Sequence, residues 1–378
     1  MAQQLALLES TVIKVKTYQI PFTGLQRQYN LHREEILDAT DQVLRSGQYM
    51  SGQYTAQFEA WLAQRNQTGH AITCHSGTHA LEIIAEYWKL DHKQQPTVLV
   101  PNLSFVATAN AFVRAGWNIH FIDTDVNGIF DPDCIPEHLE YQAIVLVGLY
   151  GSAVSHTGSV RNWTKWIDQD VTVIEDGAQN WLGDAVRVGV ATAISFDPMK
   201  NLACYGNGGA VLTNNEHFAG FARSWREHNK GEYKVQAPSN SRMSEIDCAT
   251  MMVKTKYIDQ WQHRRREIAA YWQQQFKHTS ARCLITQDNE HNHAFHKFVI
   301  DVDYRNHLQS QLAADGIVTK IHYEHALNSV SPLSGYPGPD MMSVSSLLSC
   351  RVLSLPIYPE LTDAEVEHIA SRVQAHVS

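Results

Sequence analysis

Short apolar runs alternate with amphipathic segments through the first part of the chain. The runs have the length and β-branched content of buried strands, and they cover 71–74, 97–100, 119–123, 143–147, 171–174, 193–196 and 209–213. Helical spacing predicts helices over 31–45, around 58–62, over 80–87 and over 104–115. This alternation is typical of a mostly parallel sheet with helices on both faces. The pattern therefore predicts an α/β fold, in which ligands bind beyond the carboxyl ends of the strands.

The two ends of the chain differ from this middle part. Residues 1–25 are mixed in character and predict an N-terminal arm, which leaves 26–245 for the large domain. A smaller C-terminal α+β domain is predicted for 246–378. Its elements are a long charged helix over 254–276, a strand over 295–302, a helix over 305–315, a strand-like stretch over 317–322 and a final helix that starts in the capping-box pattern Thr362-Asp363-Ala364-Glu365.

Composition limits the class of protein. A hydrophobic content of 44% fits a globular chain, and a net charge of −9 argues against binding to nucleic acid or acidic membranes. No apolar run reaches the roughly 18 residues that span a bilayer, and the N-terminus lacks a signal-peptide pattern. The six cysteines have no metal-site spacing, and the pair His291 and His293 predicts a solvated loop. We therefore expect free thiols, no metal and a cytoplasmic location.

An acid and a lysine follow two neighbouring apolar runs. Asp176 ends Val173-Ile174-Glu175-Asp176, and Lys200 follows the run 193–196, with glycine-rich 206–209 behind it. This arrangement suits a pyridoxal phosphate site, in which a lysine holds the cofactor as an imine and an acid faces its ring nitrogen. Two plainer interpretations stay open. Lys200 could be a surface charge beside a glycine turn, and Asp176 a helix N-cap or half of a buried ion pair.

Three further segments could complete such a site. Ser76-Gly77-Thr78 lies at a strand-to-helix turn, where backbone amides and the helix N-terminus favour an anion such as the cofactor phosphate. Phe105 could lie flat on a planar ring, and Gln179 could reach a ring hydroxyl from the turn after Asp176. Ordinary capping by the turn and a core position for Phe105 are the alternatives.

Many ordered blocks of this sequence match one pattern. They are Ser76-Gly77-Thr78-His79-Ala80-Leu81, Phe105-Val106-Ala107-Thr108-Ala109-Asn110, Leu149-Tyr150-Gly151, Glu175-Asp176-Gly177-Ala178-Gln179, the segment from Ser195 to Gly209, Asn240-Ser241-Arg242-Met243-Ser244-Glu245-Ile246, Ile321-His322-Tyr323 and Leu353-Ser354-Leu355-Pro356. From about residue 20 to 370 the chain resembles the DegT/DnrJ/EryC1/StrS family of pyridoxal phosphate-dependent sugar aminotransferases. The resemblance implies the fold-type I aminotransferase fold.

The resemblance implies a role for each candidate residue. Lys200 would carry the Schiff base and move the proton, and Asp176 would pair with the pyridine nitrogen. Asn240 would reach the phosphate from the neighbouring subunit, since family active sites are shared across a homodimer. The remaining cofactor contacts would be Gln179 to the ring hydroxyl, Phe105 to the ring face, and Gly77, Thr78 and Ser195 to the phosphate.

The resemblance also implies a reaction, the transfer of an amino group from L-glutamate to a nucleotide-linked keto-sugar in surface-polysaccharide or glycoside biosynthesis. Related dehydratases carry His where this chain has Lys200, which favours transamination. The segment 24–29 resembles members that aminate C3, so we expect a 3-keto, 6-deoxyhexose acceptor. The candidate substrate contacts are His322, Tyr323, Arg226 and Lys320, with Lys230 and Arg242 as further cations for the diphosphate.

Three positions near the expected acceptor depart from the family pattern. Gly148 stands where the family usually has His before Leu-Tyr-Gly, and Asp197 and Asn207 stand where it commonly has His and Glu. These departures leave the acceptor open. An aminotransferase that acts on a cyclitol or another small ketone is one alternative, and a non-catalytic regulatory relative is the other.

Overall fold

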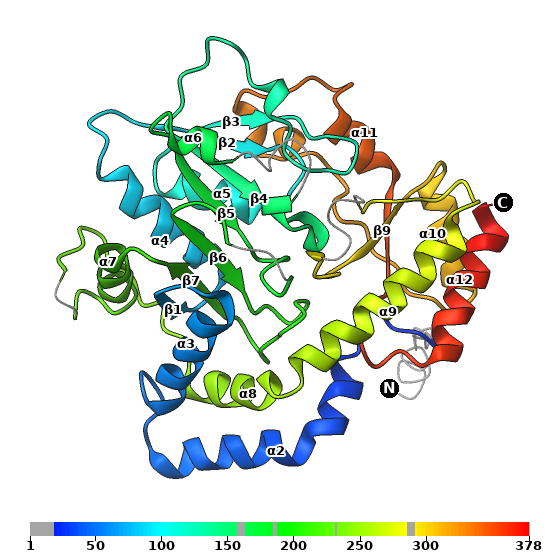
Figure 1. The fold of residues 1–378 in the computed structure, drawn as a ribbon, viewed down its shortest axis with the longest axis horizontal. Coiled ribbons are helices and arrows are strands. Elements are labelled where there is room, and N and C mark those ends of the chain that lie inside the picture. The colour runs from blue at the N-terminus through cyan, green and yellow to red at the C-terminus, as the bar shows by residue number, and fades with distance from the viewer. Residues whose placement is uncertain (1–18, 157–162, 184–186, 231–232, 286–291, 378) are drawn as a thin grey trace, which may run out of the picture.

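A seven-stranded sheet forms the centre of the protein. The computed structural model describes residues 19–156, 163–183, 187–230, 233–285 and 292–377 (Figure 1). The strand order is β1-β7-β6-β5-β4-β2-β3. The strands are β1 (His70–Cys74), β2 (Thr97–Pro101), β3 (Asn118–Ile122), β4 (Ala143–Val147), β5 (Thr172–Asp176), β6 (Ala191–Ser195) and β7 (Gly209–Thr213). Each strand coincides with a predicted apolar run, so the α/β prediction is confirmed.

Strand direction gathers the predicted site at one edge of this sheet. β2 pairs in parallel with β3 and β4, β4 with β5, and β5 with β6, whereas β7 runs antiparallel to both β6 and β1. The carboxyl ends of β1, β2, β4, β5 and β6 therefore lie at the same edge, where β7 begins. In such sheets this edge is where ligands bind.

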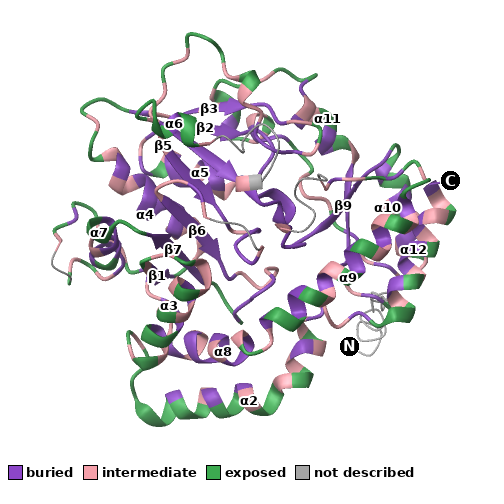
Figure 2. Ribbon diagram, viewed as in Figure 1, coloured by how far each residue is buried: buried purple, intermediate pink, exposed green. Residues whose placement is uncertain are grey.

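Helices cover the sheet, and capping residues set where these helices begin and end. α4 (Gly77–Lys89) begins where the Ser76 hydroxyl accepts a hydrogen bond from the His79 N–H, and α2 (Leu25–Ser46) ends at Gly47, whose φ of 69° suits glycine. The strands are buried while α2 exposes its outer face (Figure 2). The other helices here are α3 (Gln53–Asn66), α5 (Ala107–Arg114), α6 (Thr164–Ile167) and α7 (Glu216–Arg226), with 3-10 turns at Pro132–Cys134, Leu149–Gly151 and Val154–His156.

The predicted helix over 254–276 is wrong at its start. The chain forms two helices, α8 (Glu245–Thr255) and α9 (Ile258–Phe276), with a turn at 256–257 between them. α8 packs on α2 through Ala249 and Val253, whereas α9 turns away toward the C-terminal elements (Figure 1). Because of this break, α8 packs in one hydrophobic core with α2, and the later part of α9 packs in another with the C-terminal elements. The division into domains at residue 245 stays a prediction.

The C-terminal elements build a second core. A three-stranded antiparallel sheet, β8 (Arg282–Cys283), β9 (Phe298–Asp301) and β10 (Val352–Leu355), packs with α9, α10 (Arg305–Ala314) and α12 (Asp363–Val377). The predicted capping box is confirmed, because the Glu365 N–H donates to Thr362 Oγ1 and Thr362 N–H donates to the Glu365 carboxylate. The strand-like stretch 317–322 makes only isolated bridges. The remaining elements are α11 (Val344–Arg351) and 3-10 turns at Leu327–Ser329 and Leu333–Gly335.

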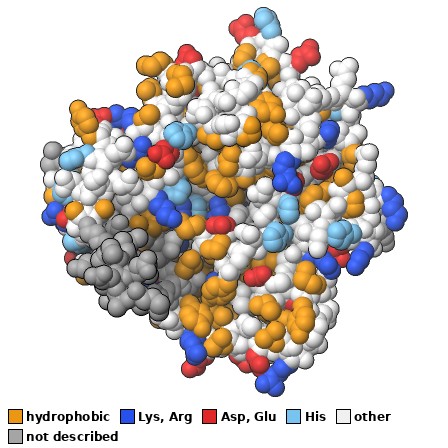
Figure 3. All heavy atoms as spheres, turned by 180° about the vertical axis from the view of Figure 1, so that it is seen from behind, with side chains coloured by type: hydrophobic (Ala, Val, Ile, Leu, Met, Phe, Trp, Pro, Cys, Tyr) orange, Lys and Arg blue, Asp and Glu red, His pale blue; other side chains and the backbone are white. Residues whose placement is uncertain are grey.

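Within the described ranges, no helix combines the length and apolarity needed to cross a membrane. On the face seen in Figure 3, basic and acidic side chains are interspersed and hydrophobic side chains gather between them.

His293 is not in a solvated loop, contrary to the prediction. It is fully buried before β9, while His291 lies outside the described residues. Its Nδ1 accepts a hydrogen bond of 2.9 Å from the Phe295 N–H, and burial lowers the pKa of its imidazole to about 3. The polar run 286–292 before this histidine indicates a loop, although the apolar residues Ala294 and Phe295 follow it directly.

This histidine should make the protein less stable in acid. Its folded pKa of about 3 lies below the ordinary 6.5, so the unfolded chain takes up the proton first. The stabilisation is complete above pH 6.5 and is lost as the pH falls toward 3, at about 1.4 kcal/mol per pH unit. Urea unfolding gives the free energy of unfolding at pH 7.5 and at pH 5.5. Between these two pH values, the free energy of unfolding should fall by about 1.4 kcal/mol less in His293→Gln than in the wild type. Equal losses in the two proteins would contradict this assignment.

Candidate active site

A cavity of about 350 Å³ lies at the carboxyl edge of the sheet. Its walls come from the β1–α4 turn, the segments after β2, β5 and β6, the segment before β9 and the segment that follows α10. The predicted residues that line it are Gly77, Thr78, Phe105, Asp176, Gln179, Ser195, Lys200, His322 and Tyr323.

Asp176 places a buried carboxylate at the end of β5. Oδ2 accepts a hydrogen bond of 2.8 Å from the Thr108 hydroxyl, and Oδ1 accepts one of 3.1 Å from the Ala178 N–H. Burial raises the pKa of the Asp176 carboxyl, while these two donors and the Lys200 ammonium oppose the shift. A buried carboxylate with donors on one side needs a cation on the other, and a protonated ring nitrogen would supply it.

Lys200 brings an amine into the same cavity from the turn after β6. Its backbone N–H donates to the Asp197 carbonyl at 2.8 Å, which closes this turn. Burial lowers the pKa of the Lys200 ammonium, and Asp176 and Asp197 partly offset the shift. A lowered pKa leaves more of the neutral amine, which is the form that attacks a carbonyl group. The surface-charge interpretation of Lys200 is therefore wrong.

The N-terminus of α4 forms the anion-binding end of the cavity. Ser76 caps the helix through its side chain, and Gly77 and Thr78 are its first residues. A Cβ on Gly77 would lie 2.7 Å from Ser195 Cβ, so only glycine lets this turn approach the end of β6. The first amides of a helix have no acceptor within it. Capping and anion binding are thus compatible here.

Aromatic and amide side chains form the wall between these two ends. Phe105 is 51% exposed, so the core interpretation is wrong, and its ring centroid lies 5.9 Å from that of Tyr323. Gln179 accepts a 2.8 Å hydrogen bond from the Tyr150 N–H and donates one of 3.2 Å to the Tyr323 hydroxyl. The Tyr150 hydroxyl donates to the His322 carbonyl. These bonds fix the Tyr323 ring at the edge of the cavity.

The donor set fits pyridoxal phosphate. An amine for its aldehyde, a buried carboxylate for its ring nitrogen, an aromatic ring for its face and a helix N-terminus for its phosphate meet in one cavity. The roles of Lys200, Asp176, Phe105, Gly77 and Thr78 toward the cofactor stay predictions. Nowhere in the described ranges do three or more His, Cys, Asp or Glu side chains gather as a metal site would require.

Several predicted contacts lie outside the lining of this cavity. The Arg226 guanidinium is buried, 2.5 Å from Glu59 Oε1 and 2.7 Å from the Thr73 carbonyl oxygen. The structure thus gives Arg226 an internal ion pair in place of the substrate contact expected from the sequence. Asn240 and Lys320 are exposed. Neither of them lines the cavity, nor do Lys230 and Arg242.

Two of the three departures from the family pattern lie at the site, and Gly148 is not among the residues that line the cavity. Asp197 and Asn207 line the cavity, and Asp197 Oδ1 accepts a 2.8 Å hydrogen bond from the Met199 N–H. A Cβ on Gly148 would lie 2.1 Å from Asn180 Cγ. Asn180 thus fills the space that a larger residue at 148 would need.

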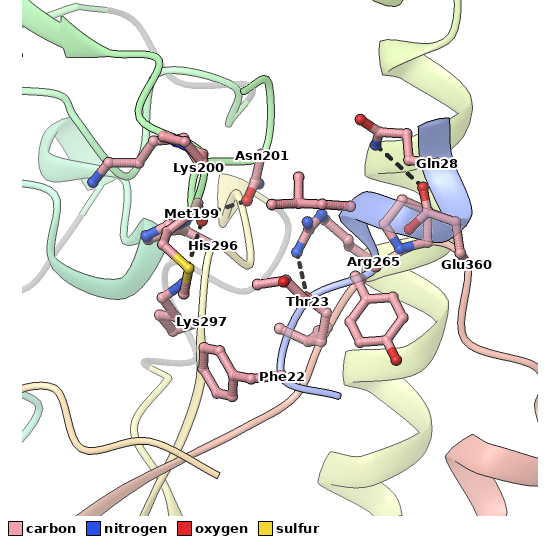
Figure 4. A pocket seen from close by; sticks show the side chains of 16 residues that line it. Phe22, Thr23, Gln28, Met199, Lys200, Asn201, Arg265, His296, Lys297 and Glu360 are labelled. Atoms are coloured by element: carbon pink, nitrogen blue, oxygen red, sulfur yellow. Dashed lines mark hydrogen bonds between the residues drawn. The ribbon is translucent and has the colours of Figure 1, made fainter. Parts of the chain in front are cut away.

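Sequence reasoning missed His296 and Lys297, which line the cavity from the segment before β9. His296 Nδ1 lies 3.3 Å from Asn201 Oδ1, and Lys297 Nζ lies 3.4 Å from the Met199 carbonyl oxygen (Figure 4). Only the packing of the second core on the first brings them there. Their one signal in the sequence is a pair of basic residues at the start of an apolar run.

Comparison with known proteins agrees with this geometry. The DegT/DnrJ/EryC1/StrS aminotransferase family model matches residues 30–374. The dTDP-3-amino-3,6-dideoxy-alpha-D-galactopyranose transaminase of Aneurinibacillus thermoaerophilus is 31% identical over 94% of this chain and 99% of its own. The erythromycin biosynthesis sensory transduction protein EryC1 of Saccharopolyspora erythraea has the same identity and coverage. The 3-oxo-glucose-6-phosphate:glutamate aminotransferase of Bacillus subtilis is 28% identical over 93% of this chain and 82% of its own.

Solved structures share the fold. S. venezuelae DesV in complex with a ketimine intermediate superposes with a TM-score of 0.86 at 27% identity, over 95% of this chain and 99% of DesV. NtdA from Bacillus subtilis with bound cofactor PMP gives 0.79 at 27% identity, over 91% of this chain and 81% of NtdA. The chain therefore belongs to the DegT/DnrJ/EryC1/StrS aminotransferase family, and its cofactor is pyridoxal 5′-phosphate.

Proposed function

We propose that this protein transfers an amino group from L-glutamate to C3 of a nucleotide-linked keto-sugar of the 6-deoxyhexose type. The observation that carries the proposal is the Lys200 amine and the Asp176 carboxylate on one cavity, beside the N-terminus of α4. Relatives named for 3-oxo or 3-amino sugars linked to dTDP or UDP support this acceptor.

The residues that line the cavity have different roles in amino transfer. When bound, the cofactor withdraws electrons from the carbon that carries the amino group. Lys200 Nζ, with its lowered pKa, takes the proton from that carbon and returns it. Asp176 would hold its carboxylate against the ring nitrogen, and the donors Thr108 and Ala178 favour its ionised form. Gln179 donates a hydrogen bond to the Tyr323 hydroxyl and so holds this ring at the wall of the cavity.

An acceptor panel tests the proposal. The protein loaded with pyridoxal phosphate would be incubated with L-glutamate and, separately, dTDP- and UDP-linked 3-keto sugars, a 4-keto sugar nucleotide, a 3-oxo-hexose phosphate and a keto-cyclitol. We expect mass spectrometry to show the amine only from a nucleotide-linked 3-keto sugar. Amination of the 4-keto sugar alone would contradict C3, and amination of the cyclitol alone would contradict the sugar.

A nucleotide-free sugar phosphate is the second candidate acceptor. It is favoured by the Bacillus subtilis relative named for 3-oxo-glucose 6-phosphate and glutamate. The panel separates it from the first candidate. A non-catalytic regulator has less support, because this chain keeps both Lys200 and Asp176 on the cavity.

We also propose that the active unit is a homodimer with shared active sites. Asn240 is exposed and does not line the cavity of its own chain, which supports a contact with the neighbouring subunit's cofactor phosphate. Phe105, half-exposed beside the cavity, supports an opening that a second copy covers.

Subunit mixing tests the shared site. Asn240→Asp should place a negative charge against the phosphate, and Lys200→Met should remove the amine, so each variant alone should be nearly inactive. Refolding them together at equal amounts should restore about a quarter of the wild-type rate, because half of the random dimers carry one intact site. Absence of any recovery, with dimers present by light scattering, would contradict a site shared through Asn240.

A further inference from the structure

Lys297 lies on the wall between the active-site cavity and a smaller one. It lines the cavity of about 350 Å³ and also an adjoining cavity of about 30 Å³. The residue is only 5% exposed. In Figure 4 the Lys297 side chain lies beside Met199 and Phe22, whereas the Lys200 side chain extends away from Arg265. Both cavities are also lined by Lys200, Met199 and His296, so the two lysines face one connected space.

The Lys297 ammonium has few partners for a buried charge. Nζ lies 3.4 Å from the Met199 carbonyl oxygen and 5.1 Å from the centre of the Phe22 ring. In the described parts of the chain, no carboxylate forms an ion pair with it. A buried lysine normally pairs with an acid or extends its ammonium to water. Lys297 has no acid partner among the described residues, and only 5% of the residue is exposed.

Its charged neighbours are mostly cations. Arg265 is buried, and among the described residues its hydrogen bonds go only to the backbone carbonyls of Phe295 at 3.2 Å and Ile357 at 2.8 Å. Lys320 places its Nζ 5.3 Å from the Phe22 ring centre, over the ring that Lys297 also contacts.

Burial and the charges of Lys200, Arg265 and Lys320 lower the pKa of Lys297, and only Asp197 opposes them. Asp197 already accepts a hydrogen bond from the Met199 N–H. Two further acids line these cavities, and both accept hydrogen bonds from other side chains, Asp176 from Thr108 and Glu360 from Gln28. Among the described residues, none of these acids forms an ion pair with Lys297.

We propose that Lys297 is the binding residue for a substrate carboxylate in this active site. The inference rests on the proposed function, since it names the group that the substrate presents. A carboxylate supplies one charge and two acceptors, which matches one ammonium with free N–H donors. Lys297 also lines the cavity of about 350 Å³, which has room for a carboxylate, whereas the adjoining space of about 30 Å³ holds a group of about water size and has no room for a diphosphate. The carboxylate can belong to the amino-acid donor or to the sugar acceptor.

A comparison of charged and uncharged ligands tests the assignment. The protein loaded with pyridoxal phosphate would be titrated with L-glutamate and with L-norvaline, which lacks the distal carboxylate, and the cofactor absorbance followed. The variants are Lys297→Met, Lys297→Arg, which keeps the charge, and Lys89→Met. Lys89 is the matched control, because it also donates to a backbone carbonyl, that of Ala115, at the far end of α4.

We expect Lys297→Met to raise the KM of one substrate at least about tenfold with little change in kcat, and Lys297→Arg to recover most of it. A higher KM for glutamate but not for norvaline would identify the distal carboxylate of the donor as the group that Lys297 binds. An equal change for both amino acids identifies the α-carboxylate. A change confined to an acceptor with a C6 carboxylate, compared with its 6-deoxy counterpart, identifies the acceptor.

Two results would overturn the assignment. One is an unchanged KM for every substrate. The other is a lower kcat together with an altered cofactor spectrum before any substrate is added. If the wild type aminates no acceptor, the proposed function fails, and calorimetric titration of glutarate into the loaded protein still tests the subsite. Lys297→Met should then bind glutarate at least about tenfold more weakly than the wild type, and equal affinity would overturn the proposal.

Discussion

Lys200→Met should lower the rate of amino transfer by at least about 10⁴-fold, because it removes both the amine that attacks the cofactor and the base that moves the proton. Methionine is also an unbranched side chain, one atom shorter than lysine, so it removes the amine from the cavity that Asp176 lines with little other change in shape. The measurement is a single-turnover reaction with L-glutamate, followed by the absorbance of the bound cofactor.

The control for this variant is Lys89→Met, whose ammonium binds the Ala115 carbonyl away from the cavity. It should retain the wild-type rate. A Lys200→Met protein that folds, binds the cofactor and keeps more than about a tenth of the wild-type rate would show that another base carries out the transfer.

Asp176→Asn should lower the rate by about 10²- to 10³-fold. The amide keeps the size of the carboxylate but loses its charge, so the ring nitrogen would no longer be held protonated. The effect should appear in kcat more than in KM, since the group faces the cofactor and not the substrate. Steady-state kinetics with L-glutamate measures both constants.

Asp123→Asn is the matched control, because Asp123 also follows a strand and is buried. Its carboxylate accepts hydrogen bonds from the N–H groups of Val344 and Ser345, at the start of α11. This variant should lose stability without losing kcat. Equal kcat in the Asp176→Asn and wild-type proteins would remove Asp176 from the cofactor site.

The sequence predicts those residues of the candidate site that lie at or near the ends of strands. Asp176 and Ser195 end strands, Gly77 lies three residues after one, and the parallel arrangement brings such positions to one edge. Their residue types then indicate an acid, a hydroxyl and an anion-binding turn. The alternation of strand and helix thus predicts both the fold and this part of the site.

The rest of the site depends on packing between distant segments. Lys297 and His296 reach the cavity only because the second core docks on the first, and no local spacing encodes that contact. Arg226 was mistaken for a substrate contact because its partner Glu59 lies far away in the sequence. The partner of a single basic residue cannot be predicted when it lies far away in the sequence and is brought close only by folding. The break between α8 and α9 was missed for the same reason, since the two helices serve different cores.

The absorbance spectrum of the purified protein, supplied with pyridoxal phosphate and recorded before and after L-glutamate, tests the central claim most directly. We predict a band from the cofactor held by Lys200 that shifts to the pyridoxamine form when glutamate is added, and that is absent in Lys200→Met. A band that glutamate leaves unchanged would contradict the proposed donor. A wild-type protein that shows no such band would contradict the assignment of Lys200 and Asp176 as the cofactor site.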